Sequence, residues 1–162
     1  MSKIEIERKF LLLNDNFKPA AFKKERIVQG FLSSVPERTV RIRLIAEAGY
    51  ITVKGIGNDS GTSRFEWEKE ISKNEALDLL ALCEPGMIEK KRYFVKVGNH
   101  TYEIDEFATE NEGLVLAEVE LSDEFEHFEK PSWLGEEVTG VTKYYNSSLV
   151  NNPFKDWKEK GE

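Results

Sequence analysis

Short segments in which charged and apolar residues alternate dominate this sequence, and within most of these segments the charges have one sign. In the first segment Glu5 and Glu7 alternate with Ile4 and Ile6. Similar sets recur along the chain: Arg41 and Arg43; Glu66, Glu68 and Glu70; Lys90 and Arg92; Glu103 and Asp105; Glu118 and Glu120. Because successive side chains of a β-strand point to opposite faces, the pattern predicts strands with one apolar and one charged face.

The grouping of like charges constrains how such strands assemble. The simplest interpretation is that each charged face is the solvated side of an antiparallel sheet. Like charges two residues apart on one face repel each other, however, and a solvated surface would be more stable with mixed signs. A closed sheet with its charged faces inside and helices packed on its apolar outside also leaves no exposed edge. We therefore expect seven or more strands forming a closed β-barrel rather than a sandwich.

Helical periodicity is limited to short stretches. The strongest covers residues 72–82, where Ser72 and Glu75 can form a capping box before Leu77 and Leu80 on one face. Weaker helices are predicted at residues 19–26, 123–129 and 144–150. We expect a single domain over residues 1–150 and a C-terminal tail over residues 151–162, loose after Pro153.

Composition excludes several classes of protein. The chain has 162 residues, 23 Lys and Arg against 30 Asp and Glu, and a net charge of −7, which argues against a nucleic-acid partner. One cysteine excludes an internal disulfide, and two histidines leave no histidine-rich metal site. No segment approaches the roughly 18 apolar residues of a membrane helix, and the first residues lack an apolar signal core. We expect a cytoplasmic protein without a membrane partner, either a monomer or a homodimer.

The inferred barrel interior carries both signs of charge. Its basic residues would be Lys9, Arg41, Arg43, Lys54, Lys90 and Arg92, and its acidic residues Glu5, Glu7, Glu66, Glu68, Glu70, Glu103, Asp105, Glu118 and Glu120. Such charges need partners, because desolvating each ion costs several kcal/mol. Clustered carboxylates suit Mg²⁺ or Mn²⁺, and clustered Arg and Lys suit phosphate. Together they indicate a metal–polyphosphate site, and the sequence has no Walker-type glycine loop that could serve instead.

A series of motifs supports this interpretation. They are Glu5-Ile6-Glu7-Arg8-Lys9, Gln29-Gly30, Arg41-Ile42-Arg43, Thr52-Val53-Lys54-Gly55, Arg64 with Glu66-Trp67-Glu68, Glu89-Lys90-Lys91-Arg92-Tyr93, Glu103-Ile104-Asp105-Glu106-Phe107, Ala117-Glu118-Val119-Glu120-Leu121, and Trp133-Gly135-Glu137-Val138-Thr139 ahead of Tyr144 and Asn146. In this order they resemble the CYTH proteins, also called triphosphate tunnel metalloenzymes. The resemblance covers about residues 3–150.

The resemblance implies an α+β chain, mainly antiparallel β, folded as an eight-stranded barrel that forms a tunnel with helices outside. It also implies a small-molecule triphosphate substrate with Mg²⁺ or Mn²⁺. The implied metal ligands are Glu5, Glu7, Asp105, Glu118 and Glu120, and the implied phosphate ligands are Lys9, Arg41, Arg43, Lys54, Arg92 and Lys143. Lys90 matches a basic position that is important for catalysis in the bacterial polyphosphatase branch. Glu66 and Glu68 match an acidic pair that faces the tunnel.

Two departures from the family pattern stand out. Phe31 replaces the tyrosine of a common Gln-Gly-Tyr motif, which removes a phenol from the tunnel. Near the end, the common Asp-x-Arg-Tyr motif has Val141 for the aspartate and Lys143 for the arginine. Lysine keeps the charge but lacks the bidentate geometry of arginine.

The leading functional prediction is divalent-metal-dependent hydrolysis of a triphosphate, with inorganic tripolyphosphate as the first choice. Glu118 or Glu120 would position or deprotonate the attacking water. An adenylate cyclase acting on ATP and a thiamine triphosphatase are alternatives within the same family. The latter needs an aromatic platform, for which the candidates are Phe31, Tyr50, Tyr93 and Tyr144. A non-catalytic polyphosphate-binding protein is a further alternative, although anion binding alone requires no metal-holding carboxylates.

Overall fold

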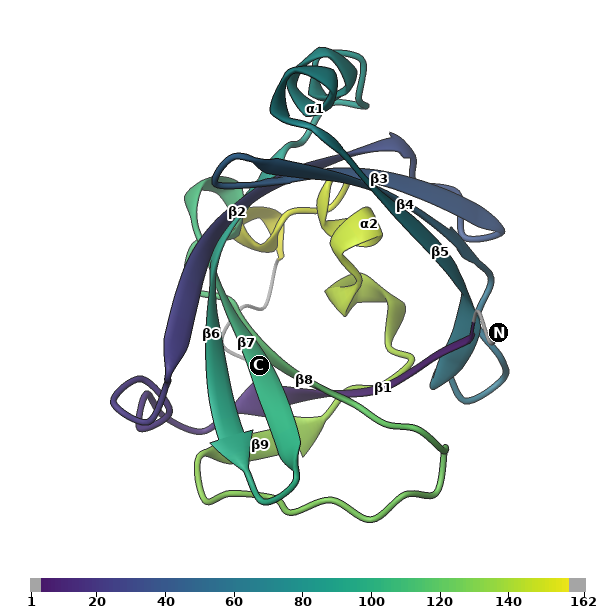
Figure 1. Cartoon of the computed structure of the whole chain (residues 1–162). Helices are drawn as coiled ribbons and strands as arrows, with labels where there is room; N and C mark the ends of the chain where they lie inside the picture. The colour runs from purple at the N-terminus through teal and green to yellow at the C-terminus, as the bar shows by residue number, and fades with distance from the viewer. Residues whose placement is uncertain (1–3, 158–162) are drawn as a thin grey trace.

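Eight strands close a barrel in the structure, a computed structural model that describes residues 4–157 (Figure 1). The barrel strands are β1 (Ile4–Leu12), β2 (Lys23–Ser33), β3 (Arg38–Ile45), β4 (Ala48–Gly55), β5 (Ser63–Ser72), β6 (Ile88–Val97), β7 (His100–Phe107) and β8 (Val115–Glu120). Neighbours follow the order β5-β4-β3-β2-β6-β7-β8-β1, and every pair is antiparallel. The predicted eight-stranded closed barrel is therefore confirmed.

Strand β1 closes the barrel and also carries an additional strand. Its first residues pair with β5, with Glu5 opposite Arg64. Its last residues pair instead with β9 (Leu134–Glu137), with Phe10 opposite Glu137. The strand β9 thus occupies the edge of β1 beyond the point where β5 diverges.

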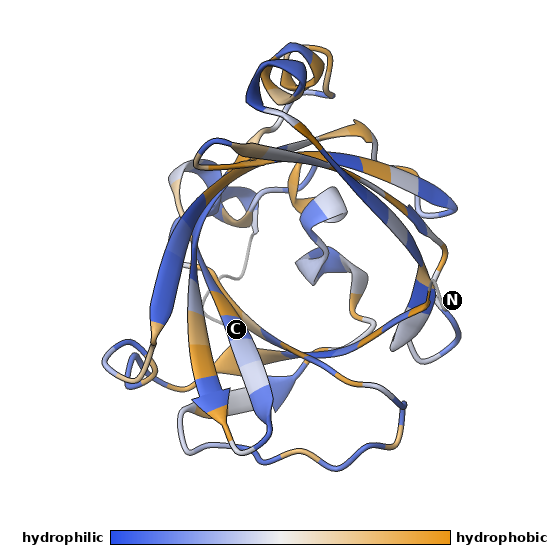
Figure 2. Ribbon diagram, in the orientation of Figure 1, coloured by the Kyte–Doolittle hydropathy of each residue, from blue (hydrophilic) through white to orange (hydrophobic). Residues whose placement is uncertain are grey.

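Hydrophilic and hydrophobic residues alternate along the strands in Figure 2. Over most of the barrel the apolar faces pack outside it, against helix α1 (Lys73–Leu80) on one side and against loops on the other. Helix α1 covers β3 and β4, where Ala76 and Leu80 pack with Ile42. Its N-terminus has the predicted capping box, in which the Ser72 side chain accepts from the Glu75 amide and the Glu75 carboxylate accepts from the Ser72 amide. This helix therefore lies outside the barrel, as expected.

Loops rather than helices cover the other side of the barrel. Phe17, Phe128 and Trp133 pack there against the outer faces of β1, β6, β7 and β8. The helix predicted at residues 19–26 is wrong, because residues from Lys23 onward form β2 and pair with β3 and β6. The helix predicted at 123–129 is also wrong: Glu126 accepts hydrogen bonds from both the amide and the hydroxyl of Ser122, which stabilises a turn instead.

The interior of the barrel is charged over most of its length and apolar at one end. Phe31, Ile88, Phe107 and Leu116 continue the inward faces of their strands and pack with Leu149. Leu149 belongs to the short helix α2 (Asn146–Leu149), which follows the 3₁₀ helix η2 (Thr142–Tyr144) and lies inside the ring of strands in Figure 1. The helical prediction for residues 144–150 is confirmed in part, but α2 covers the apolar end from within instead of lying outside.

The described part of the C-terminal tail is packed rather than loose. Two more 3₁₀ helices, η1 (Thr109–Asn111) and η3 (Phe154–Asp156), lie against each other, and the Phe154 amide donates to Asn111 Oδ1 at 2.8 Å. Phe154 and Trp157 pack against the same apolar cluster as α2. The loose terminus is therefore wrong for residues 154–157, and residues 158–162 lie outside the described residues. Within residues 4–157, no helix has the length and apolarity needed to cross a membrane.

Candidate active site

A cavity of about 470 Å³ occupies the charged part of the barrel, and all eight barrel strands contribute to its lining. The β6–β7 turn lines it at Asn99, and Tyr145, Asn146 and Ser147 line it from the C-terminal segment. Twelve of the predicted site residues lie in its wall: Lys9, Arg41, Arg43, Lys54, Lys90, Arg92, Glu5, Glu7, Glu66, Glu68, Glu118 and Glu120. The side chains that strand alternation predicts on inward faces thus meet in one cavity.

Glu70, predicted to face the barrel interior, is exposed on β5 and does not line the cavity. Asp105 is the first of two predicted ligands that do not line it either. It is buried beneath the wall, where Oδ1 accepts from Arg92 Nε at 2.7 Å and Oδ2 accepts from Arg92 Nη2 at 2.9 Å. Lys90 Nζ lies 2.8 Å from the same Oδ2. Burial favours the neutral acid, but the charges of Arg92 and Lys90 outweigh burial and hold the pKa of Asp105 well below its ordinary value. Both carboxylate oxygens of Asp105 are therefore engaged by cations of the protein. The resemblance had implied that they bind a metal.

Lys143 is the second, and the structure does not bring it to the cavity. It follows the turn of η2 to the surface, where Nζ lies 4.7 Å from the ring centroid of Trp157 and 5.3 Å from that of Tyr144. Its place among phosphate ligands was implied by the resemblance and is not supported by this position. Arg64 of β5 instead adds a cation to the cavity wall, with Nε 3.6 Å from Glu5 Oε1.

One side of the cavity has an excess of positive charge. Arg41 and Arg43 share one carboxylate oxygen, Glu68 Oε2, which lies 3.4 Å from each Nη2. Both Nε atoms are buried and have no hydrogen-bond acceptor among residues 4–157. Burial and the neighbouring charge of Arg43 lower the pKa of Arg41 to about 10. An anion in the cavity would offset this excess charge, and guanidinium groups bind phosphate oxygens well.

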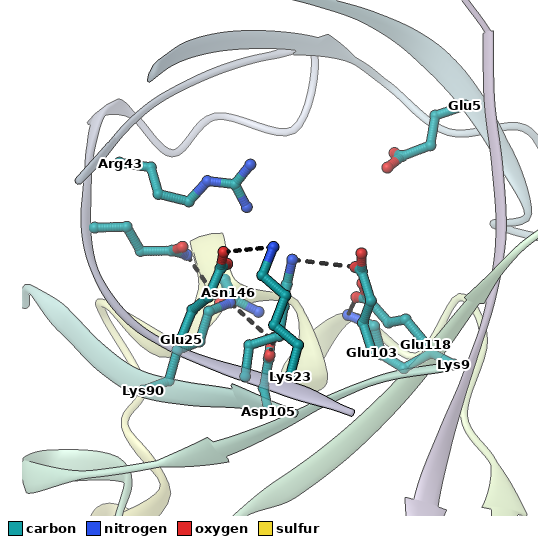
Figure 3. A network of polar contacts seen from close by, with 12 residues as sticks. Glu5, Lys9, Lys23, Glu25, Arg43, Lys90, Glu103, Asp105, Glu118 and Asn146 are labelled. Carbon is teal, nitrogen blue, oxygen red and sulfur yellow. Dashed lines mark hydrogen bonds and ion pairs between the residues drawn. The ribbon is translucent and has the colours of Figure 1, made fainter. Parts of the chain in front are cut away.

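The opposite side has an excess of negative charge. Carboxylate oxygens of Glu5, Glu66 and Glu120 all lie within 4.8 Å of one another. Lys54 partly offsets them, with Nζ 2.8 Å from Glu5 Oε1 and 3.7 Å from Glu66 Oε2. Figure 3 shows Arg43 and Glu5 facing each other across the lumen. The excess positive and the excess negative charge are therefore segregated on opposite sides of one cavity.

Shifts in the pKa values of the nearby carboxyls indicate that this charge is compensated only in part: against the effect of burial, Lys54 lowers the pKa of Glu5, but the pKa values of its neighbours are raised. Burial, together with the charges of Glu118 and Glu5, raises the pKa of Glu7 well above its ordinary value. Burial likewise raises the pKa of Glu66 and of Glu120, with the charge of Glu5 adding to the effect. Carboxylates so close together repel one another when all are ionised, and a divalent cation would offset this repulsion. Carboxylate oxygens are also ligands that Mg²⁺ and Mn²⁺ prefer.

Two other groups lie between these sides. Burial raises the pKa of Glu118, but Lys9 and Arg92 outweigh burial, so the pKa is lowered to about 2. Lys9 Nζ lies 3.3 Å from Glu118 Oε2. Burial lowers the pKa of Lys90 to about 7, although Asp105 opposes the shift. Lys90 thus combines a deeply buried amine with direct access to the cavity.

Several cavity residues lie outside the predicted set. Arg64 and Thr52 could have been found from the sequence, because they share strand faces with Glu66 and Lys54. Strand alternation could not have found Tyr145 or Asn146, which follow η2. The Tyr145 ring centroid lies 5.2 Å from Lys9 Nζ and 5.6 Å from Arg64 Cζ. It thus sits between two cations of the wall.

The aromatic platform considered for a thiamine ring is not assembled. Of its four candidates, Phe31 alone lines the cavity, at the margin of the apolar end. Tyr93 is buried on the outside of the barrel against Phe17, and Tyr144 packs against Trp157. The fourth, Tyr50, stacks near the Arg43 guanidinium without lining the cavity.

A closed barrel with an excess of positive charge on one side of its lumen and an excess of negative charge on the other defines the class of tunnel barrels that bind polyanions. A family model, the CYTH domain, matches residues 3–149. An inorganic triphosphatase of Acetivibrio thermocellus is 47% identical over 156 residues, which cover 96% of this chain and 98% of that protein. The chain therefore belongs to the CYTH domain family, as its motifs predicted.

Other relatives agree with this assignment. An inorganic triphosphatase of Nitrosomonas europaea is 34% identical over 151 residues, covering 90% of this chain and 96% of the relative. The crystal structure of an inorganic triphosphatase superimposes with a TM-score of 0.64 at 32% identity, covering 90% of this chain and 97% of that chain. Similarity in sequence and in fold thus extends over nearly the whole chain.

Proposed function

We propose that this chain is a triphosphatase that hydrolyses short inorganic polyphosphates, with tripolyphosphate as its substrate, together with a divalent cation. The segregation of charge within one cavity is the observation that carries the proposal. Arg41 and Arg43 share a single carboxylate oxygen, while three carboxylates gather across the lumen. The names of the two relatives, both inorganic triphosphatases, support the same activity.

The cations of the wall would bind and orient the phosphate oxygens. They are Lys9, Arg41, Arg43, Lys54, Arg64 and Arg92, and they come from five of the barrel strands, β1, β3, β4, β5 and β6. Fixing the chain of phosphates from several directions holds the scissile bond still and stabilises charge that develops on the leaving group. Asp105, already bonded to Arg92 and Lys90, would hold those two cations in place rather than bind a metal.

The carboxylates would hold the metal. Glu5, Glu66 and Glu120 are the set whose oxygens converge, and Glu7 and Glu118 flank them on neighbouring positions of β1 and β8. When bound, Mg²⁺ or Mn²⁺ would neutralise phosphate oxygens and polarise the phosphoryl group. The choice between the two ions, the cytoplasmic location and a monomeric or homodimeric state stay predictions.

The reaction itself needs an oriented water. Its oxygen would attack a terminal phosphorus, the bond to the bridging oxygen would break, and diphosphate would leave with the electron pair of that bond. A carboxylate of the Glu118 and Glu120 pair would orient the water and accept its proton. Lys90 would contact the phosphate that lies deepest in the lumen, close to α2.

Direct turnover assays test the proposal. The pure protein is incubated with tripolyphosphate, ATP and thiamine triphosphate, each with Mg²⁺ and with Mn²⁺, while phosphate and cyclic AMP are followed. We expect phosphate release to be fastest from tripolyphosphate and to be lost on addition of EDTA. Glu7→Gln should lose activity, whereas Glu136→Gln, at an exposed position of β9, should keep it. Formation of cyclic AMP, or binding of tripolyphosphate without turnover, would contradict the proposal.

A further inference from the structure

Asn146 brings an amide group into the deep end of the lumen from outside the strands. Its Oδ1 accepts a hydrogen bond from Lys90 Nζ at 2.7 Å (Figure 3). It accepts another from Gln29 Nε2 at 2.9 Å. Asn146 also lines the cavity, at the start of α2. It is therefore placed where the charged part of the lumen meets the apolar end.

The chemistry of the three groups fixes the orientation of both amides. A lysine amine at this position donates, so Asn146 must turn its oxygen rather than its nitrogen toward Lys90. Gln29 must then present its Nε2, because two carbonyl oxygens would repel each other. Gln29 is fully buried, and its Oε1 has no hydrogen-bond partner among residues 4–157. An unsatisfied buried oxygen costs free energy, and the bond from Nε2 to Asn146 partly offsets that cost.

The position of Asn146 is set by the packing of α2. Leu149 and Val150 are buried against Phe31 and Ile88, which close the apolar end of the barrel. The backbone of the helix is fixed by the Leu149 amide, which donates to the Tyr145 carbonyl at 3.0 Å. The C-terminal segment thus presents the Asn146 oxygen to Lys90 from a rigid support.

Without this oxygen, Lys90 keeps Asp105 as its remaining close partner. Asp105 already accepts two hydrogen bonds from Arg92, and all three groups are buried. The Lys90 amine lies between Asp105 on one side and Asn146 on the other, and its side chain reaches the cavity. Removing one of the two partners would leave the amine free to move away from the cavity and toward Asp105.

We propose that Asn146 is a positioning residue of the triphosphatase, which acts by holding the Lys90 amine at the deep end of the lumen. The inference rests on the proposed function. The C-terminal segment then takes part in the chemistry as well as covering the apolar end of the barrel. Since Asn146 acts through Lys90, its removal lowers turnover more than substrate affinity.

Steady-state kinetics with tripolyphosphate, on the full chain with saturating metal, test this role. Loss of a hydrogen bond to a charged group should lower kcat of Asn146→Ala by roughly 10- to 100-fold, with a much smaller change in KM. Asn146→Asp keeps an oxygen toward Lys90 and should recover most of kcat, while its added charge raises KM for the anionic substrate. Ser148→Ala, on the same helix but away from the cavity, should match the wild type.

A double-mutant cycle separates action through Lys90 from an independent effect. If Asn146 acts through Lys90, then adding Asn146→Ala to Lys90→Met should cause no further loss of kcat. Losses that multiply, or an Asn146→Ala variant as active as Ser148→Ala, would overturn the inference. If Asn146→Ala fails to fold in a thermal melt, Asn146→Asp decides instead, and a folded Asn146→Asp variant that does not recover kcat would overturn the inference. A wild type inactive on tripolyphosphate contradicts the proposed function itself, which is a different outcome.

Discussion

Arg92 on β6 and Asp105 on β7 form a buried, bidentate ion pair at the wall of the cavity, with N–O distances of 2.7 and 2.9 Å. The two residues are directly opposite in the strand register. Lys90 completes the group through its contact with the same carboxylate. Asp105 thus links β7 to β6 and holds two cations, Arg92 and Lys90, that line the lumen.

Asp105→Asn should destabilise the fold strongly. It removes the one buried carboxylate that Arg92 and Lys90 share, and breaking a buried ion pair typically costs about 3–5 kcal/mol in the free energy of unfolding. Urea denaturation at neutral pH measures the change. Glu103→Gln is the matched control, because Glu103 also contacts Arg92, at 3.1 Å, but is partly exposed, and its loss should cost less than about 1 kcal/mol. Equal, small losses in both variants, with reduced metal affinity in Asp105→Asn, would instead support the metal-ligand role.

The stability of the fold should increase with pH above neutrality because of Lys90. Its pKa is about 7 in the folded chain, lowered by burial, and about 10.4 in an unfolded chain. Between these values the unfolded state binds more protons, so the free energy of unfolding rises with pH by up to about 1.4 kcal/mol per unit. Urea denaturation at pH 7, 8 and 9 should show this slope in the wild type and in the exposed neighbour variant Lys91→Met. Lys90→Met should lack it, and an unchanged slope there would refute the assignment.

The barrel could be predicted from the sequence because strand alternation is a local property. Each segment such as Glu5 to Lys9 shows which side chains share a face, and grouping of like charges favours an enclosed interior. The wrong helices arose where tertiary packing overrides local preference. Phe128, in the predicted helix at 123–129, instead packs edge to face against Phe10 on the outer face of the barrel.

Only the site residues that lie on strands could be predicted from the sequence. Arg64 shares a face with Glu66 and Glu68 and was available to the same reasoning. The place of Asn146 in the cavity could not be predicted in this way, because it depends on the packing of Leu149 against Phe31 at the apolar end of the lumen. That end has a signal in retrospect: the inward face of β2 changes from polar at Gln29 to apolar at Phe31. An apolar surface inside a barrel needs cover, and α2 provides it.

Arg64 and Lys143 should differ in their effect on substrate binding. Arg64 lines the cavity, so Arg64→Ala should raise KM for tripolyphosphate by roughly 10- to 100-fold through loss of a charged hydrogen bond. Lys143 lies on the surface over Trp157, so Lys143→Ala should change kcat/KM by less than about twofold. Arg64→Lys, which keeps the charge, should recover part of the affinity. A large rise in KM for Lys143→Ala would restore the role that the family pattern implied.

Replacing one carboxylate of the Glu5, Glu66 and Glu120 cluster should have opposite effects on metal binding and on the metal-free fold. Glu66→Gln removes an oxygen ligand, so the Mg²⁺ concentration for half-maximal activity should rise by at least about tenfold. The same substitution removes a negative charge from a group whose pKa burial and Glu5 have raised, so the unfolding temperature in EDTA should increase. Glu136→Gln, outside the cavity, should change neither quantity.

Thermal melts with and without Mg²⁺ complete this test. A cation bound to the folded state alone stabilises the wild type by about 2.7 kcal/mol at one hundred times its Kd. At the same Mg²⁺ concentration the gain for Glu66→Gln should be smaller, because its Kd is higher. If Mg²⁺ stabilises both proteins equally, the cation binds elsewhere, and the cluster formed by Glu5, Glu66 and Glu120 does not hold it.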